Sequence, residues 1–159
     1  YEIPLRLVGS EMCIRDSALR VRGIFAELAD DISSKLRREG MLAGAVQVQI
    51  KDNTFKTSQY QKKLSNPTRI ADELLSAAIG LVRSNNALRV PARLVGITAC
   101  DLTGEDEGFQ LSFDFDQTHA DNMEQLGSRV DGLRDKYGKQ IIRRASQLNS
   151  EQKELKDEK

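Results

Sequence analysis

The sequence predicts an α+β domain, because helical and strand periodicities alternate along a single short chain. Residues 18–39 place apolar side chains at steps of three and four, which is typical of a helix with one buried face. Residues 46–51 instead alternate apolar and polar side chains, which is typical of a strand. With 159 residues, the chain has the length of one domain and a tail.

The first expected helix, 18–39, carries a continuous apolar stripe. Its members are Val21, Phe25, Leu28, Ile32 and Leu36. Arg37 and Arg38 occupy its last turn, where the helix dipole favours cations, and Gly40 follows in the position that often ends a helix. We therefore expect a helix whose stripe faces a core.

A hairpin with one polar strand is expected next. Its first strand alternates Val46, Val48 and Ile50 with Gln47, Gln49 and Lys51. Asp52-Asn53 has turn chemistry, and the second strand, Phe55 to Lys63, has no apolar face beyond Phe55. This pattern fits an exposed sheet face with a function, and it fits a solvated edge strand equally well.

A second helix and a third strand complete the predicted order. The helix is expected to begin near Asn66-Pro67-Thr68, with Asn66 or Thr68 as its cap. Its stripe consists of Ile70, Leu74, Ala78 and Leu81. The third strand is expected over Arg93 to Leu102. The order helix, strand, strand, helix, strand is one strand short of a ferredoxin-like arrangement.

The first 17 residues, read as codons, resemble a translated sequencing-library adapter of the transposase type. The fixed adapter text covers Tyr1-Glu2-Ile3 and Leu7 to Ser17, whereas an amphipathic strand LRLVG would explain only part of the segment. We therefore expect the domain to begin near Ala18 and its first strand to be missing. Cys13 is left out of redox arguments, and Cys100 is expected to be a buried thiol.

Composition excludes several classes of protein. There is no apolar run of membrane-spanning length, and two Cys and one His are too few for a disulfide framework or a four-ligand zinc site. The 24 basic and 24 acidic residues give a net charge of zero. That zero is a cancellation, because residues 18–103 hold 13 basic and 8 acidic residues and residues 104–159 hold 9 and 13. The basic body permits a nucleic-acid partner.

No catalytic constellation is present, which disfavours an independent enzyme. His119 is the only histidine and lies in an acidic stretch, so a histidine-based triad is not expected. The acidic clusters at 105–107 and 114–116 are interpreted as solubilising, and no phosphate-binding loop motif occurs.

Two segments indicate a binding function. The hairpin from Lys51 to Lys63 alternates cationic side chains with hydroxyl and amide side chains. These are the residue types that contact phosphates. Gln110 to Phe115 places apolar anchors after a glutamine in an acidic stretch, which is typical of a peptide that docks in a groove. The alternative for this second segment is a final strand or a helix staple.

The stretches VQVQIKDNTFKTSQYQKKLSNPT, PARLVGITACDL, GFQLSF and YGKQIIRRAS, in this order, resemble the C-terminal little finger domain of Y-family translesion DNA polymerases of the DNA polymerase IV (DinB) type. The resemblance implies an antiparallel sheet with two helices on one face. It also implies an open sheet face that contacts the DNA backbone in the major groove, and a segment that binds the sliding clamp.

Pattern and resemblance together assign two sets of site residues. The predicted DNA-binding residues are Lys51, Lys56, Thr57, Ser58, Gln59, Gln61, Lys62, Lys63, Arg93 and Thr98. The predicted clamp-binding residues are Gln110, Leu111, Phe113 and Phe115. The family commonly has an arginine at the position of Tyr60, and Phe113-Asp114 departs from the five-residue clamp motif, whereas Phe115 fits the six-residue form.

The expected organisation is an adapter-derived segment at 1–17, the DNA-binding domain at 18–103, an acidic linker with the clamp motif at 104–120, a helical segment at 121–148 and a disordered tail at 149–159. The resemblance implies a monomer that binds duplex DNA and the sliding clamp in the cytoplasm, without a membrane. The catalytic palm is absent, so Mg²⁺ is implied only for the parent polymerase and no cofactor is expected here. The alternative is a stand-alone clamp- or RNA-binding adaptor.

Overall fold

The computed structural model describes residues 3–8, 18–89, 91–105 and 116–145. Its elements are β1 (Ile3–Val8), α1 (Ala18–Glu39), β2 (Met41–Asp52), β3 (Thr57–Thr68), α2 (Ala71–Ser84), β4 (Ala92–Gly104), α3 (Gln117–Tyr137) and a short 3₁₀ turn, η1 (Lys139–Ile141). The predicted order of helices and strands between residues 18 and 104 is confirmed.

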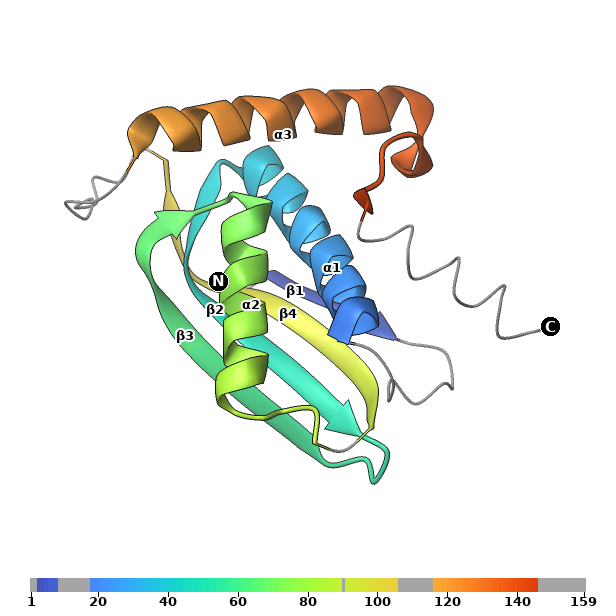
Figure 1. Ribbon diagram of the computed structural model, residues 1–159. Helices are drawn as coiled ribbons and strands as arrows, with labels where there is room; N and C mark the ends of the chain where they lie inside the picture. Colours follow the sequence, from blue (N-terminus) through green and yellow to red (C-terminus); the bar gives the residue numbers. More distant parts are fainter. Residues whose placement is uncertain (1–2, 9–17, 90, 106–115, 146–159) are drawn as a thin grey trace.

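The sheet is antiparallel with the strand order β1-β4-β2-β3. Helices α1 and α2 lie on one of its faces, as the α+β prediction with two helices on one face requires (Figure 1). Helix α3 crosses one end of this two-layer body (Figure 1). The strands β4, β2 and β3 form the three-stranded part of the sheet that the sequence predicted.

The core lies between the sheet and the two helices. Its largest fully buried side chains from the helices are Phe25, Leu28, Ile32, Leu36 and Leu74, and from the strands Val46, Val48, Val95 and Ile97. The whole predicted stripe of α1 is buried, because its steps of three and four keep these side chains on one face of the helix. Cys100 is buried, as expected.

The start of α2 differs from the prediction. Strand β3 continues through Pro67 to Thr68, and α2 begins only at Ala71, after a cap residue, Ile70, that has no capping side chain. The Thr68 hydroxyl instead accepts a hydrogen bond from the Ile70 N–H at 3.1 Å. Proline is tolerated here because β3 is an edge strand. On such a strand every second backbone N–H group points away from the sheet, so its loss removes no hydrogen bond between strands.

The expectation of a missing first strand is wrong in the structure. Residues Ile3–Val8 pair with β4 from Ala99 to Leu94 and form the edge of the sheet. An unpaired edge strand presents a row of free N–H and C=O groups, and a segment that alternates apolar and other residues can satisfy them. Whether residues 1–17 derive from an adapter is a separate matter and stays a prediction.

We expect β1 to stabilise the domain through this pairing. Replacing residues 3–8 with Gly-Ser repeats keeps the chain length and should lower the midpoint of thermal unfolding by several degrees, since about 1 kcal/mol corresponds to roughly 4–8 °C in a domain of this size. Differential scanning calorimetry of this variant and of a chain starting at Ala18 measures the effect. An unchanged midpoint in both would show that the pairing contributes nothing to stability.

In α3, the helix begins at Gln117, within the segment expected to be linker, and Asp116 caps it by accepting a hydrogen bond from the His119 N–H at 3.1 Å. His119 therefore lies in the first turn of a helix. Gly138 closes the helix with a positive φ of 94°, inside the segment 121–148 that was expected to be helical. None of the helices in the described residues is long and apolar enough to cross a membrane.

Candidate nucleic-acid interface

The sheet face opposite the helices is polar. The strand register places Gln47 beside Gln61, Gln49 beside Gln59, and Lys51 beside Thr57. On the other side of β2, Thr98 of β4 pairs with Gln47. Since residues i and i+2 of a strand share a face, Lys63 lies in line with Gln61 and Gln59. We call this set the open face: Gln47, Gln49, Lys51, Thr57, Gln59, Gln61, Lys63 and Thr98.

Six of the predicted DNA-binding residues are therefore brought together on the open face. They are Lys51, Thr57, Gln59, Gln61, Lys63 and Thr98. Gln59, Gln61 and Lys63 are exposed, whereas Gln47, Gln49 and Lys51 are half-buried between neighbouring strands. Within the described residues, no carboxylate forms an ion pair with Lys51 or Lys63. Their charges are consequently available to an outside partner.

Two predicted residues lie on the other face. Ser58 pairs with Ile50, and Lys62 pairs with Val46, so both share the face of the core side chains. The physical reason is the period of two, because adjacent residues of a strand point to opposite faces. Ser58 and Lys62 therefore do not lie on the open face, although the side chain of Lys62 is exposed at the edge strand. Their predicted contact with DNA stays a prediction.

Tyr60 also belongs to the helix-covered side. It pairs with Val48 and is half-buried against the core. The position at which an arginine was expected therefore holds a packing residue in this chain.

The remaining predicted residues, Lys56 and Arg93, lie at the tip of the β2–β3 hairpin. Lys56 precedes β3, and the guanidinium carbon of Arg93 lies 4.7 Å from the centroid of the Phe55 ring. The Asp52 carboxylate accepts hydrogen bonds from the Thr54 hydroxyl at 2.6 Å, the Thr54 N–H at 2.8 Å and the Lys56 N–H at 2.9 Å. The Thr54 hydroxyl in particular lowers the pKa of Asp52, because hydrogen bonds to the carboxylate favour its charged form.

The predicted clamp-binding residues Gln110, Leu111, Phe113 and Phe115 lie outside the described residues. The structure does define where this segment is attached. It leaves the domain after Glu105, whose N–H donates to the Gly40 carbonyl at 3.2 Å, and returns at Asp116, before α3.

A single arginine that the sequence did not point to links both flanks of this segment. The Arg69 guanidinium forms ion pairs with Glu105, at the end of β4, and with Glu124 of α3, the latter at 2.8 Å. Its side chain is mostly buried. Arg69 therefore holds the two flanks of residues 106–115 at the same side of the domain.

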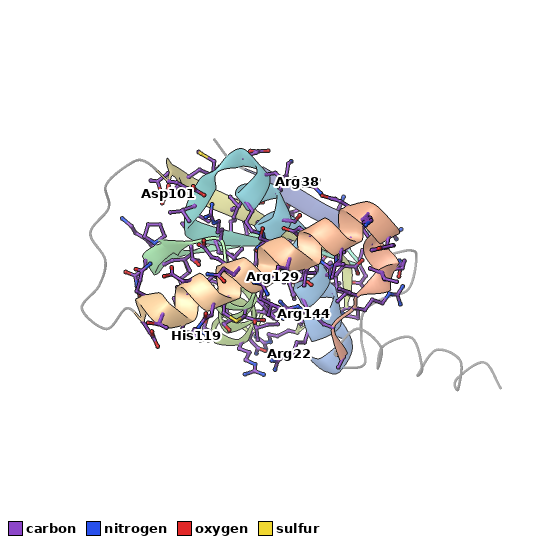
Figure 2. The ribbon with its side chains drawn as sticks, turned by 90° about the horizontal axis from the view of Figure 1, so that it is seen from above. Arg22, Arg38, Asp101, His119, Arg129 and Arg144 are labelled. Atoms are coloured by element: carbon purple, nitrogen blue, oxygen red, sulfur yellow. The ribbon has the colours of Figure 1, made fainter. Side chains whose placement is uncertain are left out.

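Ion pairs also attach α3 and the turn after it to α1. The pairs are Arg37–Asp131, Arg38–Asp135, Arg134–Asp30, Lys139–Asp31 and Arg144–Asp30, and Arg144 also binds Asp72 of α2. Figure 2 shows α3 from above, running across the domain from His119 past Arg129. The apolar side chains of α3 contribute less to this attachment, because Met123 and Val130 are half-buried but Leu126, Leu133 and Tyr137 are exposed.

We expect the Arg37–Asp131 pair to dominate this attachment. The two side chains are 15% and 13% exposed and lie 2.7 Å apart, so Arg37→Ala leaves a buried carboxylate unpaired and should destabilise the docked state of α3 by about 2 kcal/mol. Arg38→Ala is the matched control, because its pair with Asp135 is 62% exposed at both ends and should contribute well under about 1 kcal/mol. Hydrogen exchange of the α3 amides measures both, and equal protection in the two variants would contradict the expectation.

The described residues contain no group of three or more His, Cys, Asp or Glu side chains that could hold a metal ion.

Comparison with known proteins now identifies the family. A model of the impB/mucB/samB family C-terminal domain matches residues 14–113, which is more than half of the chain. The chain belongs to this family. Its sequence is 28% identical to DNA polymerase IV of Clostridium kluyveri over 130 residues, covering 77% of this chain and 32% of that protein. It is 29% identical to DNA polymerase IV 1 of Bacillus subtilis over 136 residues, covering 84% of this chain and 32% of that protein.

The chain thus spans about a third of the length of the curated relatives it matches. The resemblance to the C-terminal region of Y-family DNA polymerases is confirmed.

Solved structures of members of this family share the fold. The little finger domain of PolIV, in a complex with the beta-clamp processivity factor, superposes with a TM-score of 0.52 at 17% identity, covering 72% of this chain and 100% of that chain. A chimera of the Y-family DNA polymerases Dbh and Dpo4 gives a TM-score of 0.52 at 16% identity, covering 65% of this chain and 29% of that chain. The predicted little finger fold is confirmed.

Proposed function

We propose that this chain is the DNA-binding and clamp-tethering C-terminal region of a translesion DNA polymerase of the DNA polymerase IV type. The observation that carries the proposal is the open face, whose strand segments 45–51, 57–63 and 94–100 contain no Asp or Glu. The acidic side chains that pair with cations lie instead on α1, α2, α3 and at the end of β4. The neutral chain therefore offers a surface that an anionic backbone can approach without repulsion.

The chemistry of the open face suits contacts to phosphates. Two lysine ammonium groups stand among the amides of four glutamines and the hydroxyls of two threonines, all of which can donate hydrogen bonds to phosphate oxygens. Contacts of this kind carry no sequence information, so we expect duplexes of different sequence to bind. Of the similar solved structures, Dbh DNA polymerase was solved as a post-insertion binary complex, which supports DNA as a partner, and the little finger domain of PolIV was solved with the beta-clamp processivity factor, which supports the clamp as a partner.

The clamp part of the proposal depends on the segment 106–115. Arg69 pairs with Glu105 before this segment and with Glu124 after it, so both flanks of the segment are held to the same domain that carries the open face. A tether of this kind raises the effective concentration of the clamp at the DNA site. Catalysis would reside in the part of the polymerase outside this chain.

The experiment is a fluorescence-anisotropy titration of a labelled duplex with the full chain at several salt concentrations. Since about 0.9 counterions are released per neutralised phosphate, contact with three to five phosphates should give a log–log slope of roughly −3 to −4. Duplexes of different sequence should bind equally. A flat salt dependence, or binding to single-stranded RNA in preference to the duplex, would overturn the proposal, and the latter would favour a stand-alone RNA-binding adaptor.

A further inference from the structure

Phe55 has an unusual place in the structure. It is a large apolar residue that is 61% exposed, and it adopts a left-handed backbone conformation with a φ of 67°. Asparagine or glycine would occupy such a turn position at lower cost. An exposed aromatic ring in a strained position therefore needs a reason beyond the turn itself.

The turn that carries Phe55 is fixed from several sides. The Asp52 carbonyl accepts a hydrogen bond from the Phe55 N–H at 3.1 Å, and the Asp52 side chain binds the two N–H groups of Thr54 and Lys56. The Asn53 N–H donates to the Pro91 carbonyl at 3.1 Å, which ties the tip to the residue before β4. The position of the ring is consequently determined by the hairpin and by its neighbouring strand.

Two cations gather around this ring. The guanidinium carbon of Arg93 lies 4.7 Å from the ring centroid, and the Lys51 ammonium nitrogen lies 5.2 Å from it. They come from different strands, Lys51 from β2 and Arg93 from β4. No carboxylate of the described residues forms an ion pair with either one.

This arrangement places two like charges against one ring at the hairpin end of the sheet. The ring quadrupole attracts both cations, but it leaves their mutual repulsion uncompensated. An anion that contacts both cations removes that repulsion. Because the cations are already in place, less side-chain freedom is lost when the anion binds.

We propose that Phe55 is a positioning residue that holds Lys51 and Arg93 as a paired binding site for backbone phosphates of duplex DNA. The site rests on the proposed function, and it extends the open face to the hairpin tip. Phe55 itself contributes no charge and acts only through the two cations.

The test replaces Phe55 with other uncharged side chains and measures how the salt dependence of duplex binding changes. Phe55→Leu keeps an apolar side chain but removes the ring, so duplex binding near 100 mM salt should weaken about two- to fivefold and the log–log salt slope should become less steep by roughly 0.5 to 1. Phe55→Trp, which keeps a ring that attracts cations, should restore the affinity and the slope. A purely structural role would not change the slope, because no charge has been removed.

Phe55→Asn separates folding from binding. Asparagine suits the left-handed conformation, so this variant should unfold at or above the temperature of the parent chain and yet show the same loss of slope as Phe55→Leu. The double change Lys51→Ala and Arg93→Ala should lower the duplex affinity less in the Phe55→Leu variant than in the parent chain. The reason is that the three residues act as a unit, so Phe55→Leu has already removed part of their contribution.

The outcomes distinguish this inference from the proposed function. If the parent chain shows no salt-dependent duplex binding, the proposed function fails and this site fails with it. If the parent chain binds with the expected slope but Phe55→Leu and Phe55→Asn bind with the same slope and affinity, the positioning role of Phe55 is overturned and the proposed function stands.

Discussion

The double substitution Lys51→Ala and Lys63→Ala is expected to weaken duplex binding by up to about 60-fold near 100 mM salt. Each lysine that neutralises a phosphate releases about 0.9 counterions, which is worth roughly eightfold in affinity at that salt concentration. The log–log salt slope should become less steep by about 1.8. Both lysines lie on the open face without an ion pair to a described carboxylate, so their removal leaves no buried charge behind.

Lys62→Ala is the matched control for this expectation. Lys62 is adjacent to Lys63 on the same strand and has the same charge and side-chain length, but it pairs with Val46 on the helix-covered side. Anisotropy titrations should therefore show a smaller loss of duplex affinity for Lys62→Ala than for Lys63→Ala. Equal losses would show that net charge, and not the open face, determines binding.

The comparison of Lys62 with Lys63 also shows what the sequence could predict about the site. The pattern predicted a strand rich in phosphate-binding side chains, and that strand is present. It could not assign faces, because β3 has no apolar alternation of its own to mark the buried side. Its faces are determined by the register with β2, in which Gln47 and Gln61 are opposite each other.

The fold was predictable where apolar periodicity is strong. The stripe of α1 and the Val46, Val48 and Ile50 alternation both face the core as expected. The edge strand β1 was not predicted, since its partner is β4, at the far end of the domain sequence, and pairing of this kind leaves no local signal.

For a similar reason, the sequence could not predict the contacts of Arg37, Arg69 and Phe55. Each joins residues that are distant along the chain, as in the pair between Arg37 and Asp131. Charged residues on a helix surface are ordinarily solvated, so the sequence alone predicts a soluble face for them. The docking of α3 across α1 brings Arg37 and Asp131 together, whereas the strands of the sheet bring Arg93 to the ring of Phe55.

The substitution of Gln110 and Phe115 with alanine is expected to abolish binding of the sliding clamp while leaving DNA binding intact. An extended peptide that docks in a groove is anchored by a few buried side chains, and each aromatic anchor contributes roughly 1.5–3 kcal/mol. Removing Phe115 together with the polar contact of Gln110 should therefore lower the affinity by at least about a hundredfold. Surface plasmon resonance with an immobilised bacterial clamp measures this loss, and the anisotropy titration with duplex DNA supplies the internal control.

A second substitution tests whether the clamp motif acts as a local peptide. Arg69→Ala breaks the ion pairs to Glu105 and Glu124 that hold the flanks of the segment, but it leaves residues 106–115 unchanged. A local peptide should still bind the clamp after this change, with a modest loss because more chain must be ordered on binding. If the alanine changes at Gln110 and Phe115 unfold the domain, the segment is a structural strand and the clamp assignment is wrong. If clamp binding persists at full strength in a folded variant, the motif lies elsewhere, and the polar residues 147–159 become the next segment to delete.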